Sequence, residues 1–257
     1  MRRILFIFGS FCVGFNAARA SHELGHVIAL WLSGGRGVLI TLHPFTWSFA
    51  GFQTNPNPLA TAWGGVILGP SLALLLLLIS WPFRKRAYLA LVLTAMTAVC
   101  SLAHTGLYLL VGTALDAGDP GSLLRLGMPR PLLLGLGLLT IIGACFLTAT
   151  FLSLIGLASG ESLGRRALLL ELGILPYLLL MLAYQLIHDD NPAGLRFWLV
   201  SIGAVPILIL FIALSPHLLS ASLRYKLSLP AIEPSWKAVV GSLGLGALVV
   251  VGELVVF

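Results

Sequence analysis

The stretch WGGVILGPSLALLLLLISW, from Trp63 to Trp81, decides the fold class, because its 19 residues include no charged side chain. About 20 apolar residues in a helix are enough to cross the hydrocarbon core of a bilayer. Similar runs recur along the 257-residue chain, which is 58% hydrophobic and only 9% charged. A soluble domain carries about 25% charged residues. The mean hydropathy of +1.02 therefore indicates a membrane protein.

The order of these runs predicts an all-α polytopic membrane protein with about seven transmembrane helices, since the strict alternation of a transmembrane barrel is absent. The expected spans are 4–32, 63–81, 88–111, 132–157, 167–187, 197–219 and 238–257. Residues 33–58 are rich in Gly, Pro and polar side chains and alternate in part, which predicts a short hairpin-like or re-entrant segment after the first span. The first run is longer than the apolar core of a signal peptide, so we expect it to stay uncleaved, with cleavage as the alternative.

The charge distribution predicts an orientation. The net charge is +6, and no basic run is interleaved with aromatic residues, so nucleic acid is not an expected partner. Four basic residues fall on one expected side of the bilayer, and ten fall on the other: Arg2, Arg3, Arg84, Lys85, Arg86, Arg165, Arg166, Arg224, Lys226 and Lys237. The positive-inside rule then places the N-terminus in the cytoplasm and the loops around residues 116–119 and 188–190 outside.

The three cysteines, Cys12, Cys100 and Cys145, all lie within apolar runs and form no CxxC pair. We interpret them as small packing residues rather than as disulfide partners or thiolate ligands of a metal.

The pentapeptide His22-Glu23-Leu24-Gly25-His26 is the strongest chemical signal in the chain. On a helix, histidines four residues apart lie on one face and can hold one Zn²⁺ between them. The glutamate between them is not a ligand but can take a proton from zinc-activated water. Asn16 and Arg19 share about the same face, so the polar stripe is expected to point into the bundle. The alternative is an inert polar cluster, although ionisable groups inside a span cost about 2.5–3.5 kcal/mol each and usually serve function.

A catalytic zinc site needs a third protein ligand and one open position. The candidates are His104, Asp116, Asp119, His43 and the cluster His188-Asp189-Asp190. We predict Asp119, because the third span delivers it to the same side as the motif and because Asp-Pro suits a helix start with Asp as the cap. Asp116 ranks second. His104 ranks third, since it lies deeper and can orient a ligand instead.

All of these candidates except His43 also have an interpretation in which the residue supports the structure and binds no metal. His104 can pack against another helix with its ring hydrogen-bonded. Asp116 and Asp119 can form a turn pair around Gly118 and Pro120, and the cluster at residues 188–190 can cap a loop.

Several of these segments together resemble the site-2 protease family of intramembrane zinc metalloproteases. The resemblance rests on SHELGH in the first span, the Gly-Gly after it, the hairpin-like segment, GGVILGPSL in the next span and LDAGDPG at residues 115–121, and it covers residues 1–125. It implies that an aspartate from a later core span is the third ligand. Two features differ from the family's usual pattern: the Asn-Pro-Asp-Gly type of motif is absent, and no PDZ-like domain is inserted. The expected outward-facing site also differs from the family's usual cytoplasmic one.

The resulting prediction is an intramembrane zinc metalloprotease of the cell membrane that hydrolyses a peptide bond of a membrane-anchored protein substrate. Residues 1–125 would form the metalloprotease-like core and residues 126–257 additional helices of unknown role. Zn²⁺ would be held by His22, His26 and Asp119, with Glu23 as the general base. The alternative is a non-proteolytic multi-pass membrane protein, a transporter or assembly scaffold, with a structural or vestigial metal site.

Overall fold

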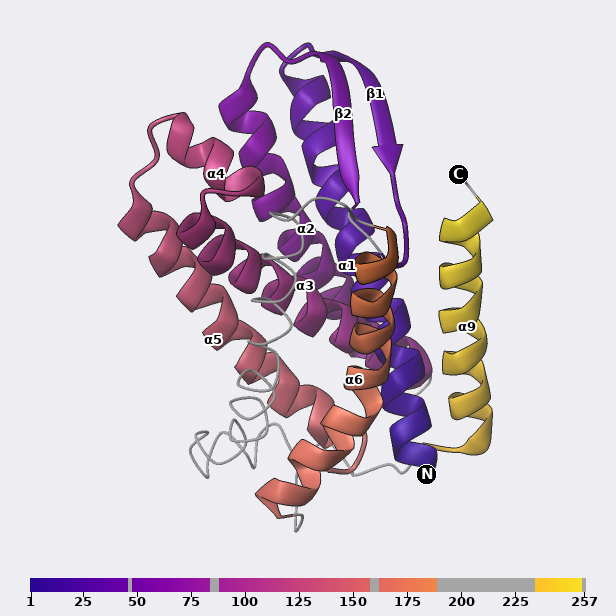
Figure 1. The fold of residues 1–257 in the computed structure, drawn as a ribbon. Helices are drawn as coiled ribbons and strands as arrows, with labels where there is room; N and C mark the ends of the chain where they lie inside the picture. Colours follow the sequence, from indigo (N-terminus) through magenta and orange to yellow (C-terminus); the bar gives the residue numbers. More distant parts are fainter. Residues whose placement is uncertain (46–47, 84–87, 158–161, 189–233, 256–257) are drawn as a thin grey trace.

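The computed structural model describes residues 1–45, 48–83, 88–157, 162–188 and 234–255 (Figure 1). Six of the helices in this part are long and apolar enough to cross a membrane. They confirm the expected all-α polytopic membrane protein. The expected span at residues 197–219 lies outside the described residues.

The described helices include a short one, Gly118–Arg125, outside the predicted spans, and the other six begin and end within five residues of those spans. The described helices are α1 (Arg2–Leu32), α2 (Pro58–Ser80), which continues into the 3₁₀ turn η1 (Trp81–Phe83), α3 (Tyr88–Leu115), α4 (Gly118–Arg125), α5 (Arg130–Leu154), α6 (Leu163–His188) and α9 (Trp236–Val255). The segment between α1 and α2 forms two strands, β1 (Arg36–Thr41) and β2 (Phe49–Thr54).

Local sequence signals fix the connection between α1 and α2. After α1, Gly34 adopts φ +79°, the left-handed conformation that ends many helices, and Gly35 donates its N–H to the Leu30 carbonyl. The start of α2 is capped by Asn57, whose side-chain oxygen accepts the Ala60 N–H at 3.0 Å, with Pro58 in the first turn. These signals fix where α1 ends and where α2 begins.

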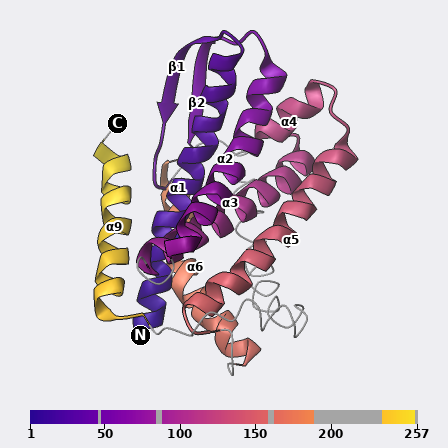
Figure 2. The ribbon, with the colours of Figure 1, turned by 180° about the vertical axis from the view of Figure 1, so that it is seen from behind.

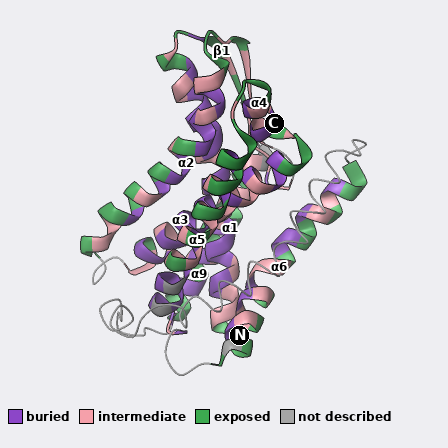
Figure 3. Cartoon of the chain, turned by 90° about the vertical axis from the view of Figure 1, so that its left-hand side faces the viewer, coloured by how far each residue is buried: buried purple, intermediate pink, exposed green. Residues whose placement is uncertain are grey.

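Helix α1 is the central element of the bundle. Helices α2, α3, α6 and α9 all pack against it, and α5 packs along α3 (Figures 1 and 2). Buried residues are concentrated along α1 (Figure 3), where Phe6 and Ile7 are fully buried in the main apolar cluster. Exposed apolar side chains lie on the outer faces of α2, α5 and α9, such as Leu78, Leu139 and Leu248. An apolar outer face is what a bilayer requires of a spanning helix.

The segment after α1 is an antiparallel hairpin, as predicted, with Arg36 opposite Thr54 and Thr41 opposite Phe49. The strands fold back along α1, so that the turn between them reaches the level of Arg19 (Figure 1). Since Arg19 lies 13 residues before the last residue of α1, Leu32, the hairpin descends about 20 Å along the helix.

Buried hydrogen bonds hold the hairpin turn in place. Arg19 donates from Nη2 to the Ser48 hydroxyl at 2.7 Å and from Nη1 to the Pro44 carbonyl at 3.3 Å. The Tyr177 hydroxyl of α6 donates to the same carbonyl at 2.8 Å, and Asn16 donates to the Tyr177 oxygen at 2.8 Å. These bonds join α1, α6 and the hairpin into one unit beside the polar stripe of α1.

Candidate metal centre

The polar stripe of α1 points into the bundle, as the sequence predicts. His22, Glu23 and His26 are 5%, 6% and 6% exposed, and Asn16 and Arg19 are also buried. Because α1 is enclosed by other helices, these groups face protein rather than lipid, which is the arrangement that spans with ionisable residues require.

Two consecutive glycines of α2 make room for the histidine rings. The backbones of Gly25 in α1 and Gly64 in α2 touch so closely that a Cβ on either residue would collide with the carbonyl of the other. At Gly65, a Cβ would lie 2.5 Å from Nε2 of His26 and 2.8 Å from Cε1 of His22. The Gly-Gly pair therefore brings α2 directly against Nε2 of His26 and Cε1 of His22.

The close contact of Gly65 with the histidine rings can be tested by substitution. If the histidines hold zinc, Gly65→Ala should weaken its binding about tenfold or more, because the added methyl group would displace Nε2 of His26 and the ring of His22. The measurement is the dissociation constant for zinc in a competition with a chelating dye. The matched control is Gly135→Ala on α5, where a Cβ meets no described atom within 4 Å. Unchanged zinc affinity in Gly65→Ala would show that this close packing does not position the histidines.

Asp119 lies in the first turn of α4 and not at its cap. The helix begins at Gly118, and its N-cap is Ala117, so the prediction of Asp119 as a capping residue is wrong. Gly118 adopts φ +61°, and a Cβ there would collide with the Tyr108 hydroxyl. The Asp119 N–H donates to this hydroxyl at 3.0 Å. Since the carboxylate does not cap its own helix, it is available to face α1.

The carboxylate of Asp119 meets both histidines of the motif. Its Oδ2 lies 3.0 Å from Nε2 of His22 and 3.1 Å from Nε2 of His26, and the two Nε2 atoms are 3.2 Å apart. Ligand atoms about 2.0–2.1 Å from a tetrahedral zinc ion are about 3.3 Å apart. The three atoms therefore form nearly the triangle that three protein ligands present to zinc, with a fourth position remaining.

The hydrogen bonds around this triangle also suit a cation. Nδ1 of His26 lies 2.7 Å from the Thr61 carbonyl, which fixes the proton of a neutral ring on Nδ1 and directs the Nε2 lone pair at Asp119. Burial raises the pKa of the Asp119 carboxyl, whereas hydrogen bonds donated by Nε2 of protonated His22 and His26 would hold that pKa below its ordinary value. A lone pair and a carboxylate oxygen at 3.1 Å repel each other unless a proton or a metal cation binds between them.

The ring of His22 is held by aromatic contacts. It stands perpendicular to the rings of His104 and Tyr108, at interplanar angles of 89° and 87°, and these two rings stack parallel to each other. Nδ1 of His22 is buried without a hydrogen-bond partner among the described residues. Packing against the rings of His104 and Tyr108 thus orients His22, whereas a hydrogen bond orients His26.

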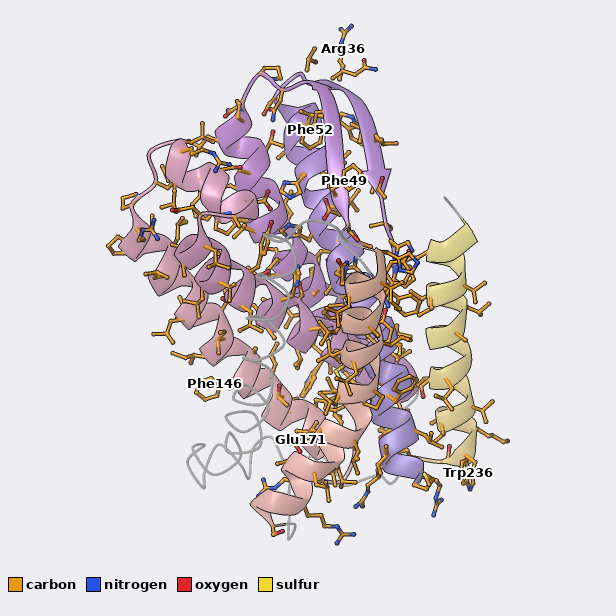
Figure 4. All side chains as sticks on the ribbon, in the orientation of Figure 1. Arg36, Phe49, Phe52, Phe146, Glu171 and Trp236 are labelled. Carbon is orange, nitrogen blue, oxygen red and sulfur yellow. The ribbon has the colours of Figure 1, made fainter. Side chains whose placement is uncertain are left out.

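Glu23 shares a cavity of about 590 Å³ with the three converging side chains. One wall consists of residues of the hairpin, including Phe49 and Phe52 of β2 (Figure 4), and another consists of α4 and the residues that precede it. The cavity is within the size range of ligand sites in proteins, about 300–1,000 Å³. The carboxylate of Glu23 and the converging atoms therefore line the same space.

The other candidate ligands lie elsewhere. Asp116 adopts φ +53° and pairs with Arg130 at 2.8 Å on the surface. His104 packs against the rings of Phe15, His22 and Tyr108 and is not among the converging residues. His43 lies in the hairpin turn, where its Nδ1 accepts the Phe45 N–H. His188 ends α6, stacked on Tyr184, whereas Asp189 and Asp190 lie outside the described residues.

Two further groups, the Thr61 carbonyl and Tyr108, contact the converging residues, and the sequence pattern assigned neither of them a role there. The Thr61 carbonyl is a backbone group, which no residue pattern could reveal. Tyr108 follows His104 at helical spacing on α3, and that spacing was the available signal. Its contact with the Asp119 N–H depends on how α4 folds back on α3.

Comparisons of the chain with protein-family models, with curated proteins and with solved structures found no match.

Proposed function

We propose that this protein is an integral membrane zinc metalloprotease that cleaves a membrane-anchored protein. The observation that carries the proposal is the convergence of two imidazole nitrogens and one carboxylate oxygen within 3.2 Å, beside the buried carboxylate of Glu23. Two histidines and a carboxylate, with one open position, are the protein ligand set of a well-known class of zinc peptidases.

The residues of the centre have separate roles in this proposal. His22, His26 and Asp119 would hold the ion, which supplies Lewis acidity and lowers the pKa of bound water to about 7. Glu23 comes from the same helix as the two histidines and lines the same cavity, so it would accept the proton of the attacking water and pass it to the leaving amine. Tyr108 would hold Asp119 in place through the backbone N–H of that residue.

The hairpin would hold the substrate. A transmembrane helix hides its carbonyl groups in hydrogen bonds, so a substrate must be extended before it is cut. In the described part of the chain β2 is paired with β1 on one edge only, and residues of β2 line the cavity. An extended substrate segment could pair with the other edge of β2 and so pass the centre with its carbonyls exposed.

The proposal is tested by metal analysis and by cleavage on the same preparation. We expect the purified full-length protein to contain one zinc ion per chain and to cut an unstructured reporter peptide, with both properties lost in His22→Ala. His188→Ala is the matched control, because it removes an exposed histidine at the end of α6 and should change neither property. A folded wild-type protein that binds no zinc would contradict the proposal. Zinc without cleavage would leave the alternative, a non-proteolytic protein with a structural metal site.

A further inference from the structure

A second cavity lies at the other end of the bundle, away from the metal centre. The helices α1, α6 and α9 all begin at this end (Figure 1), and this cavity of about 220 Å³ lies at the starts of α1 and α6. Three arginines from two helices line it, together with apolar groups: Met1, Arg2, Arg3, Arg165, Leu169 and Pro234. The cavity is therefore small, and its described lining combines basic and apolar side chains.

The electrostatics of this cavity favour an anion. Arginines are suited to phosphate because the guanidinium group presents five N–H donors in a planar fork, so one that already has a protein partner can still donate to a ligand. The positive ends of three helix dipoles lie at the same end of the bundle. None of the described residues that line the cavity is acidic, and Glu171 of α6 lies about 9 Å further along the helix than Arg165.

The surroundings resemble the boundary between a bilayer and water. The guanidinium of Arg2 lies over the ring of Trp236, 5.9 Å from its centroid, and Trp236 is 55% exposed at the start of α9 (Figure 4). Exposed tryptophans beside basic residues are typical of the interface, and basic clusters there attract anionic lipid headgroups. An apolar wall next to the arginines would suit the glycerol and first methylene groups of a lipid.

We propose that this cavity binds a phosphate group, supplied by the headgroup of an anionic phospholipid. Arg2, Arg3 and Arg165 donate to the phosphate oxygens, and Leu169 contacts the glycerol backbone. The bound headgroup bridges the starts of α1 and α6, two helices that pack against each other.

The test measures binding to the full-length protein in detergent. Short-chain phosphatidylglycerol, short-chain phosphatidylcholine and inorganic phosphate are titrated separately, and dissociation constants are obtained from the shift of the melting temperature. We expect phosphatidylglycerol to bind at least about tenfold more tightly than phosphatidylcholine. We expect Arg165→Gln to weaken that binding at least about tenfold. Arg165→Lys should weaken it less because the positive charge remains, but should still weaken it because the planar fork of donors is lost.

The matched control is Lys237→Gln, which removes an exposed charge at the same end of the molecule but outside the cavity. Unchanged binding in this variant, with loss in Arg165→Gln, supports the site. Inorganic phosphate that binds as tightly as the lipid, with the same dependence on Arg165, supports the site with free phosphate as its ligand. Equal loss in Lys237→Gln and Arg165→Gln would mean attraction by diffuse charge only and would overturn the proposal. A protein that binds neither phosphatidylglycerol nor inorganic phosphate would also overturn it.

Discussion

Glu23→Gln is expected to lose about 10²–10⁴-fold of the cleavage rate while it keeps zinc and the fold. The amide has nearly the same size and shape as the carboxylate, so the packing of α1 should survive, but it cannot accept a proton from water. Glu23 is buried and lines the same cavity as the converging ligand atoms, which is where a general base must lie. The measurement is the rate of reporter-peptide cleavage at saturating zinc, together with the zinc content of the same sample.

Glu171→Gln is the matched control, because it makes the same chemical change on α6 at the opposite end of the bundle. It should leave the rate unchanged. Glu23→Asp adds a second comparison, since it keeps the carboxylate and withdraws it by one methylene, so that its rate should lie between those of the wild type and Glu23→Gln. Wild-type turnover by Glu23→Gln would remove this residue from the mechanism.

The membrane spans follow from the sequence because a bilayer imposes one simple rule. A spanning helix satisfies its own backbone and shows lipid an apolar surface, so length and composition alone locate it. The polar stripe of α1 follows from the helical period in the same way, since Asn16, Arg19, His22, Glu23 and His26 all face one side and all are buried. These features depend on residues near each other in the chain, and a local pattern is enough to predict them.

Features that depend on distant contacts were harder to predict. The sequence indicated a hairpin, but its descent along α1 depends on Arg19, Tyr177 and the Pro44 carbonyl, which are far apart in the chain. The prediction favoured Asp119 as the third ligand because the third span delivers it to the side of the motif and because it was expected to cap a helix. The structure instead has Ala117 at the cap and Asp119 as the second residue of α4. The left-handed Gly118 and the Tyr108 hydroxyl determine where the carboxylate points, and no local pattern contains that information.

Asp119→Ala is expected to weaken zinc binding by well over 100-fold. Loss of a group that merely orients a ligand typically costs about 10–100-fold in metal affinity, and loss of a ligand itself should cost more. Oδ2 of Asp119 is the one carboxylate oxygen, among the described residues, that lies within 3.1 Å of both Nε2 atoms of the motif. Its removal also takes away the negative charge that offsets the charge of the ion.

Asp116→Ala is the matched control, because it removes the same side chain three residues earlier in the chain. The carboxylate of Asp116 is 61% exposed and pairs with Arg130, an interaction worth about 0.2–1 kcal/mol at a surface. Zinc affinity in this variant should stay near that of the wild type. His104→Ala should fall between the two, at about 10–100-fold, because His104 contacts the ring of His22 without reaching the converging atoms.

The three variants are compared by bound zinc after identical dialysis and by competition with a chelating dye. The expected order of zinc affinity is wild type, Asp116→Ala, His104→Ala and then Asp119→Ala. Full retention of zinc by Asp119→Ala, with loss in Asp116→Ala or His104→Ala, would contradict the assignment. Because Asp119 lies in the first turn of α4, where a negative charge also stabilises the helix, Asp119→Asn is included to separate the two effects. Asn keeps the shape of the side chain and removes the anionic ligand, so a loss of zinc without a loss of melting temperature would assign the effect to the metal centre.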